Sequence, residues 1–126
     1  MTRKSSPPSS PRSTERHRVE RAIELYLRQC FRTPTVARVS ELAAALGANR
    51  TYLSRVVAGV LGEPLSRALR RRQLAYAEEL LRTSDLPIAE VAITAAFGTT
   101  RTFFRAFFRE YGMTPNSYRE KATKCP

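Results

Sequence analysis

The sequence has very few of the side chains that support catalysis or bind metal ions. Its 126 residues include one histidine, His17, and two cysteines, Cys30 and Cys125. One imidazole and two distant thiols cannot supply the four ligands of a structural zinc site, and they form no disulfide framework. We therefore expect no enzyme, no metal site and no cofactor, and the scarcity of cysteine suits a reducing cytoplasm.

Long apolar runs and acidic residues are scarce as well. No stretch approaches the roughly 18–20 apolar residues that a membrane span needs, and the basic N-terminus lacks the apolar centre of a secretory signal. The chain has 11 acidic residues against 22 lysines and arginines, which gives a net charge of +11. Such an excess indicates a polyanionic partner, with nucleic acid ahead of an anionic membrane surface.

The apolar residues that are present recur at steps of three and four, without the alternation typical of strands. This spacing predicts an all-α protein with about seven helices. Residues 1–13, MTRKSSPPSSPRS, are rich in serine and proline, and we expect a disordered basic tail there. The first helix is expected over 14–31 with Thr14 as its N-cap and Cys30 on its buried face. The folded domain should extend over 14–121, followed by a frayed tail, 122–126.

Two segments of the chain repeat each other. Arg55 and Gly62 match Arg105 and Gly112 at a spacing of 50 residues. The segment Glu41-Leu42-Ala43 matches Glu90-Val91-Ala92 at a spacing of 49, which places one additional residue in the second copy. Each copy has the apolar spacing of a helix-turn-helix unit, with Gly47 as the turn residue and Asn49 as the cap in the first. We expect a first unit over 38–62, a long linker helix over 64–83 and a second unit over 87–112.

One set of residues in the repeated segments forms a specific motif. It comprises Phe97, Phe103, Arg105, Phe107, Gly112, Thr114-Pro115 and Tyr118-Arg119, together with Leu42-Ala43, Leu53, Arg55 and Gly62 upstream. By this motif, residues 38–119 resemble the DNA-binding domain of the AraC/XylS family of bacterial transcription regulators. The resemblance implies two helix-turn-helix units held apart by one long helix. It also implies a transcription regulator, usually an activator. A chain of this length resembles the short members of the family, which lack a sensor domain and tend to bind DNA as monomers.

The sequence departs from the family pattern at three places. Ala96 stands where the family commonly has glycine, which is expected to tighten or shift the second turn. Ala58 and Gly59 replace basic residues of the first recognition helix, so the first unit should hold phosphates less firmly. Gln73 replaces an arginine of the linker helix.

A recognition helix presents its outward side chains to the major groove, where every base pair has its own donor and acceptor pattern. Matched to the family pattern, the candidates for base contact are Thr51, Ser54 and Arg55 in the first unit and Thr100, Arg101, Thr102, Phe104 and Arg105 in the second. The candidates for phosphate contact are Arg50, Arg70, Arg71 and Arg109. For Arg105, phosphate binding or bracing of the fold is an equal alternative. Phe104 either contacts a thymine methyl group or packs against a neighbouring helix.

The main hypothesis is a monomer that reads two successive major grooves of double-stranded DNA, roughly 34 Å apart on straight DNA. The target should be asymmetric because the two recognition helices differ. RNA polymerase is a further candidate partner. The alternative hypothesis is a helical interaction module that contacts polymerase or another regulator through Phe104 and Phe108. Nonspecific coating of DNA is a third reading, which the two distinct recognition helices disfavour.

Overall fold

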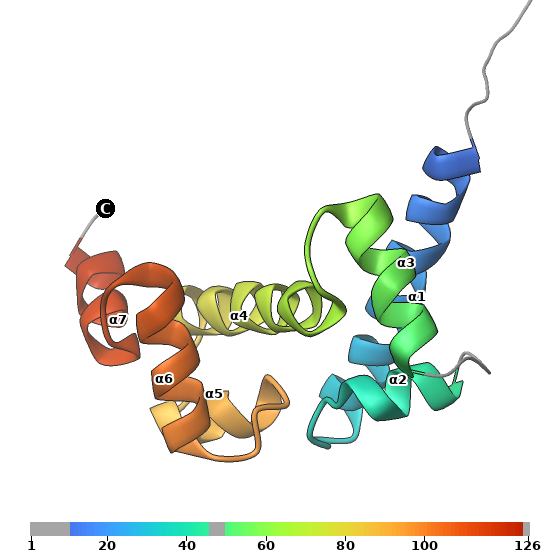
Figure 1. Cartoon of the computed structure of the whole chain (residues 1–126). Coiled ribbons are helices and arrows are strands. Elements are labelled where there is room, and N and C mark those ends of the chain that lie inside the picture. Colours follow the sequence, from blue (N-terminus) through green and yellow to red (C-terminus); the bar gives the residue numbers. More distant parts are fainter. Residues whose placement is uncertain (1–10, 46–49, 125–126) are drawn as a thin grey trace, which may run out of the picture. The chain divides into compact units, whose positions relative to one another are not determined.

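The computed structural model describes residues 11–45 and 50–124, and every regular element in those ranges is an α-helix (Figure 1). The helices are α1 (Pro11–Arg32), α2 (Val39–Ala45), α3 (Arg50–Leu61), α4 (Leu65–Thr83), α5 (Ile88–Thr94), α6 (Thr100–Tyr111) and α7 (Pro115–Lys124). The predicted all-α class with seven helices is confirmed. None of these helices has both the length and the apolar character required to cross a membrane.

The two ends of the folded region differ from the expectation. α1 begins at Pro11, so Thr14 lies inside the helix and its predicted role as N-cap is wrong. Proline suits a first helical position because its fixed φ matches the helix and the N–H it lacks would have no partner there. α7 continues to Lys124, so part of the segment expected to fray is helical. The rest of the predicted N-terminal tail, 1–10, lies outside the described residues.

The contacts divide the chain into two compact units. The first contains the described residues of Met1–Tyr26 and Arg38–Ala68, and the second contains Leu27–Ala37 and the described residues of Leu69–Pro126. α2 and α3 belong to the first unit, while α5, α6 and α7 belong to the second. α1 and α4 each contribute residues to both units.

The structure reproduces the sequence repeat helix by helix. α2 and α5 each have 7 residues, and α3 and α6 each have 12. Gly62 and Gly112 end α3 and α6 in the same left-handed conformation, with φ of 77° and 74°, which glycine adopts without a steric penalty. Their N–H groups donate to the carbonyls of Ala58 and Phe108, four residues earlier in each copy. The predicted turn at Gly47 and cap at Asn49 lie outside the described residues.

The core of the first unit joins α1, α2 and the start of α4. Ile23, Leu42 and Leu65 are almost completely buried. Tyr26 adds a polar connection at the edge of this core. Its hydroxyl donates to Glu41 Oε1 at 2.7 Å and accepts from the N–H of Arg38 at 2.9 Å, which fixes the beginning of α2 against α1.

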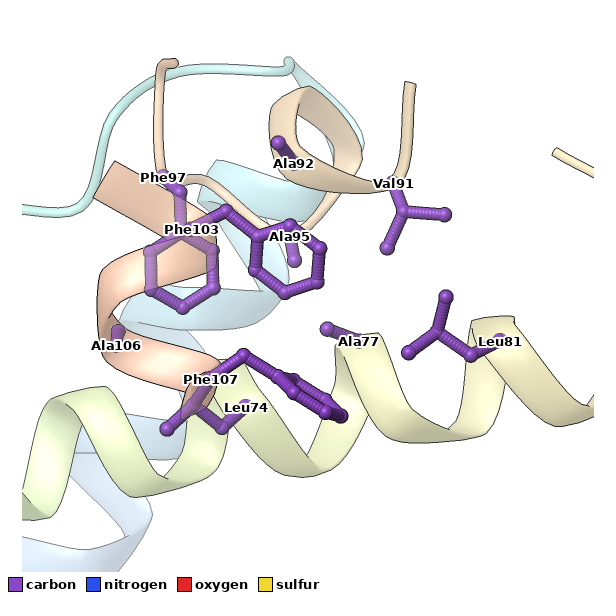
Figure 2. Packing of buried hydrophobic residues seen from close by; sticks show 10 residues of the cluster. All are labelled: Leu74, Ala77, Leu81, Val91, Ala92, Ala95, Phe97, Phe103, Ala106 and Phe107. Atoms are coloured by element: carbon purple, nitrogen blue, oxygen red, sulfur yellow. The ribbon is translucent and has the colours of Figure 1, made fainter. Parts of the chain in front are cut away.

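The core of the second unit lies where α4, α5 and α6 meet (Figure 2). Its buried members are Leu74, Ala77 and Leu81 of α4, Val91 and Ala92 of α5, Ala95 and Phe97 of the turn, and Phe103, Ala106 and Phe107 of α6. The small alanines let the helices approach closely, and the phenylalanine rings fill the remaining volume. The rings of Phe103 and Phe107 pack edge to face with centroids 5.6 Å apart, a favourable aromatic geometry. This core determines which side of α6 is left for a partner.

The turn of the second unit has an unusual residue and two supports. Ala96 adopts a left-handed conformation with φ of 68°, a region that normally favours glycine. Its carbonyl accepts hydrogen bonds from Gln73 Nε2 at 3.0 Å and from the N–H of Ala37 at 3.1 Å. Gln73 Nε2 also donates to the carbonyl of Ala95 at 3.1 Å. The alanine therefore adopts a conformation that normally favours glycine, and neighbouring segments hold that conformation in place.

Candidate nucleic-acid interface

α6 has one face in the core and one face in solvent. Phe103, Ala106 and Phe107 are buried, and Phe103 and Phe107 are fully enclosed at 0 % exposure. The exposed face includes five of the predicted contact residues: Thr100, Arg101, Thr102, Arg105 and Arg109. Because residues three and four apart share a face of a helix, the three arginines form one basic stripe along α6. The core thus fixes a helix that presents hydroxyl and guanidinium donors outward.

Both ends of α6 are capped by its own sequence. The Thr99 side chain accepts a hydrogen bond from the N–H of Thr102 at 3.1 Å, which satisfies one of the free donors of the first turn. Gly112 ends the helix in the left-handed conformation, and its N–H bonds to the carbonyl of Phe108 at 2.8 Å. The helix is therefore stable at its N-terminal end, where a recognition helix normally meets base edges.

A concave pocket of about 300 Å³ lies between α4 and α6. It is lined by Arg70, Thr102, Arg105, Ala106 and Arg109. Four of these five were predicted as contacts with DNA, two of them with phosphate. No acidic side chain lines the pocket. The structure therefore brings Arg70 together with Arg105 and Arg109, which lie 35 and 39 residues further along the sequence.

The two phenylalanines on the neighbouring side of α6 differ in burial. Phe104 is half-buried, packs against the core, and has its ring centroid 6.3 Å from that of Phe103. This position favours the packing role over contact with a thymine methyl group. Phe108 is 57 % exposed, an unusually large fraction for an aromatic side chain.

The corresponding helix of the first unit, α3, has two arginines where α6 has three. Thr51 and Arg55 are exposed on α3, as expected of contact residues. Ala58 and Gly59 are also exposed, at the positions that Phe108 and Arg109 occupy in α6. Arg50 and Ser54 belong to α3, but their side chains lie outside the described part of the structure. Arg71, the remaining phosphate candidate, is exposed on α4.

Several residues that position this surface were not assigned a role by the sequence. Arg119 donates to the carbonyls of Leu81 at 3.2 Å, Leu86 at 2.5 Å and Ser84 at 3.2 Å, and so holds the end of α4 and the segment leading to α5. The only signal was its place in the family motif. Gln73 departs from that motif, but the sequence does not indicate the two carbonyls to which it donates.

Glu78 joins three helices through two tyrosines. Its carboxylate oxygens accept from the hydroxyls of Tyr111 at 3.2 Å and Tyr118 at 2.5 Å. Burial, followed by the nearby charge of Glu78, raises the pKa of Tyr111 to about 12. Burial and the hydrogen bond to Glu78 also raise the pKa of Tyr118. Both tyrosines are therefore neutral donors at physiological pH and hold the C-terminal end of α6 against α4 and α7.

Comparison with known sequences agrees with this geometry. The model of a helix-turn-helix domain family matches residues 42–121. The regulatory protein SoxS of Salmonella typhimurium is 32% identical over 83 residues, which cover 66% of this chain and 78% of SoxS. The transcriptional regulator Rob of the same organism is 30% identical over 84 residues, covering 67% of this chain and 29% of Rob. The names of these relatives describe a regulatory protein and a transcriptional regulator.

Solved structures give the same result. The C-terminal domain of AraT, a response regulator from Geobacillus stearothermophilus, matches with a TM-score of 0.72 and 30% identity, over 89% of this chain and 86% of that domain. The DNA-binding domain of AdpA, a global transcriptional factor solved in complex with a target DNA, matches with a TM-score of 0.68 and 26% identity, over 90% and 93% of the two chains. The chain belongs to the AraC/XylS family of helix-turn-helix transcription regulators.

Proposed function

We propose that the protein regulates transcription by inserting α6 and α3 into the major groove of double-stranded DNA and reading bases with the outward residues of each helix. The observation on which this rests most directly is the face of α6, where Thr100, Arg101 and Thr102 are exposed in the capped first turn. Arginine can donate to guanine O6 and N7 at once, and a threonine hydroxyl can serve either donors or acceptors. We assign Arg101 as the main base-reading residue of α6.

On α3 we assign base contact to Thr51, Ser54 and Arg55, with Arg50 on the phosphate backbone. Thr51 and Arg55 are exposed and four residues apart, so they share one outward face. The outward residues of α3 and α6 are different, although the two helices have the same length. An asymmetric target with two blocks therefore fits a monomer that reads successive grooves, because each helix would recognise its own block.

The two units should not bind the phosphate backbone of DNA with equal affinity. α6 has Arg109 where α3 has Gly59, and it shares a pocket with Arg70 of α4. Cationic contacts with phosphate supply most of the salt-dependent affinity of such complexes. The tandem domain over 14–121 would thus obtain the larger part of its electrostatic affinity from the second unit.

A second function, contact with RNA polymerase or another regulator, is favoured by one observation. Phe108 is 57 % exposed beside the basic stripe, although its neighbour Phe107 is fully buried. A large exposed aromatic ring is typical of interface anchors. Activation of transcription in the bacterial cytoplasm would combine both functions in one chain.

The test is selection of bound duplexes of about 25 base pairs from a random pool at near-physiological salt, since affinity depends steeply on salt. The wild type should enrich an asymmetric motif with two blocks. Arg55→Ala should remove base preference from one block and Arg101→Ala from the other. A pool without enrichment, together with binding that disappears as salt rises, would contradict sequence-specific regulation.

A further inference from the structure

The pocket between α4 and α6 has the chemistry of an anion site. Arg70 approaches it from α4, and Arg105 and Arg109 approach from successive turns of α6. A guanidinium group donates hydrogen bonds and accepts none. Three such groups around one hollow favour a ligand whose surface consists of acceptor oxygens.

Thr102 completes the set of donors. The Thr99 hydroxyl donates to Thr102 Oγ1 at 2.9 Å and accepts from the Thr102 N–H at 3.1 Å. Because Thr102 Oγ1 is the acceptor in the first bond, its own hydroxyl hydrogen remains available to a ligand. The polar side chains that line the pocket can thus all donate to the same bound group.

Some arginines outside the pocket are paired with carboxylates or hydrogen-bonded to carbonyls. Arg67 lies 3.6 Å from Glu63, Arg16 lies 3.4 Å from Glu20, and Arg119 donates to three carbonyls. Within the part of the chain that the structure describes, Arg70, Arg105 and Arg109 have no acidic partner within 4.0 Å. Like charges that converge repel one another, and a bound anion would relieve that repulsion.

We propose that this hollow is a phosphate-binding pocket, in which Arg70, Arg105 and Arg109 hold one phosphate group and Thr102 donates to one of its oxygens. Arginine pairs with phosphate through parallel N–H donors, and this geometry gives the strongest hydrogen bonds available to it. Arg105 consequently contacts the phosphate backbone in place of a base edge. In this respect the inference deepens the proposed DNA-binding function and rests on it.

The ligand chemistry is a phosphate oxyanion, and it has two sources. One is a backbone phosphate of the bound DNA. The other is a free diphosphate, which a pocket of about 300 Å³ has room to hold. A free anion in this position would compete with DNA, because both would use the same three arginines.

The first arm measures free anion. Wild-type protein is titrated with inorganic pyrophosphate by calorimetry in a magnesium-free buffer of constant ionic strength. Arg105→Gln and Arg70→Gln are compared with Arg28→Gln, which removes the same charge from an exposed position outside the pocket. We expect saturable binding of one anion, at least tenfold weaker in the two pocket variants and within twofold of wild type in the control. Thermal unfolding of each variant verifies that it is folded.

The second arm measures DNA. Arg105→Gln should weaken binding to all sequences alike, leave the selected motif unchanged and reduce the dependence of log K on log salt by about 0.9. Neutral methylphosphonate links placed one at a time should identify a single phosphate whose replacement weakens wild type but not Arg105→Gln. If Arg105→Gln instead loses preference at one base pair, then Arg105 contacts a base, and its assignment to phosphate is overturned.

The two arms separate the sources and separate this inference from the proposed function. Pyrophosphate binding that requires Arg70 and Arg105 supports the pocket even if no DNA motif is selected. A methylphosphonate effect without pyrophosphate binding supports the pocket and assigns it to the DNA backbone alone. Failure of both arms, or an equal loss of anion binding in Arg28→Gln, overturns the pocket even if the wild type selects a clear motif.

Discussion

Gln73 Nε2 lies 3.0 Å from the carbonyl oxygen of Ala96. This hydrogen bond holds the alanine in a left-handed backbone conformation, which favours glycine. Gln73 is the only buried polar or charged side chain among the described residues. Its amide also bonds to the preceding carbonyl, so one donor group from α4 fixes the turn that leads into the recognition helix. The stability of the second unit and the orientation of α6 therefore depend on the same side chain.

Replacement of this amide should destabilise the fold. Gln73→Leu removes both hydrogen bonds and leaves a buried carbonyl without its donor, which costs about 1–3 kcal/mol. Gln73→Glu should cost more, because a carboxylate would face two carbonyl oxygens. Urea denaturation measures both. Gln29→Leu, at an exposed position of α1, is the control and should change stability by less than about 0.5 kcal/mol. Equal losses at the two positions would contradict the role of Gln73.

Gly98 should tolerate a side chain less well than Gly112. Both have a left-handed backbone, with φ of 86° and 74°, so alanine at either position costs about 1–2 kcal/mol. Only at Gly98 would the new Cβ meet another residue, at 2.8 Å from Cγ2 of Val36. Gly98→Ala should therefore cost about 1 kcal/mol more.

A double-mutant cycle isolates that contact. In a Val36→Ala background, Gly98→Ala should lose its additional cost and match Gly112→Ala in the free energy of unfolding. If the additional cost persists without Val36, the contact is not its source.

The tyrosines on Glu78 should make stability fall at high pH. The pKa of Tyr111 is raised to about 12 from an ordinary value of 10.0, so its contribution is fully present below pH 10. It is lost as pH rises from 10 towards 12, because the unfolded state ionises first. Absorbance at 295 nm should show tyrosines that titrate late, and Tyr111→Phe should reduce that late phase and leave the contribution of Tyr118.

Glu78→Gln tests the physical cause. Removal of the carboxylate charge should lower the pKa of both Tyr111 and Tyr118, while burial keeps that of Tyr111 above 10.0. The pH range over which Tyr111 loses its contribution to stability should then be narrower. An unchanged titration curve would mean that Glu78 does not contribute.

Arg119 should be needed for stability and not for DNA contact. Its guanidinium serves three carbonyls, and a lysine ammonium cannot reproduce that planar arrangement of donors. We expect Arg119→Lys to cost about 2 kcal/mol in urea denaturation, as for lost hydrogen bonds to a charged group. Arg32→Lys, at an exposed position, is the matched control. Below the unfolding transition, Arg119→Lys should retain wild-type affinity for DNA.

Phe108 distinguishes the two proposed functions. Phe108→Ser should leave the free energy of unfolding near that of wild type, because the ring is 57 % exposed. Its affinity for DNA should stay within twofold of wild type. It should weaken any contact with polymerase, which an assay of transcription from a selected site would show. Phe107→Ser should unfold the domain, since that ring is fully buried. A large loss of DNA affinity in Phe108→Ser would place the ring at the DNA instead.

Helical periodicity was sufficient to predict the helices but not the contacts between distant residues. Regular spacing indicated the linker helix, expected over 64–83 and observed as α4 over Leu65–Thr83, to within one residue, because such signals lie within a few turns of one chain segment. The bonds of Gln73 and Arg119 join residues 22 to 38 positions apart, and no local pattern encodes them. The start of α1 differs from the expectation because Pro11, in the proline-rich segment, is a helical residue. Its alternative role as a first helical residue was the available signal.

The pocket shows the same limit at the candidate site. Arg70 and Arg109 were both predicted to contact phosphate, but only the packing of α4 against α6 shows that they share one hollow with Arg105. The helical spacing of Phe104 likewise gives no indication of its packing against the core, which only the structure shows.

In the duplicated helix pair, the residues that keep the protein folded are different from the residues that face a partner. Gly62 and Gly112 end their helices in the same conformation, yet the outward side chains of α3 and α6 are different. A substitution at Thr51 or Arg101 leaves the cores untouched, so each can change without loss of the fold. If each helix reads its own block, one half of an operator can drift while the other keeps the regulator in place. The target sequence of the regulator could then change one block at a time.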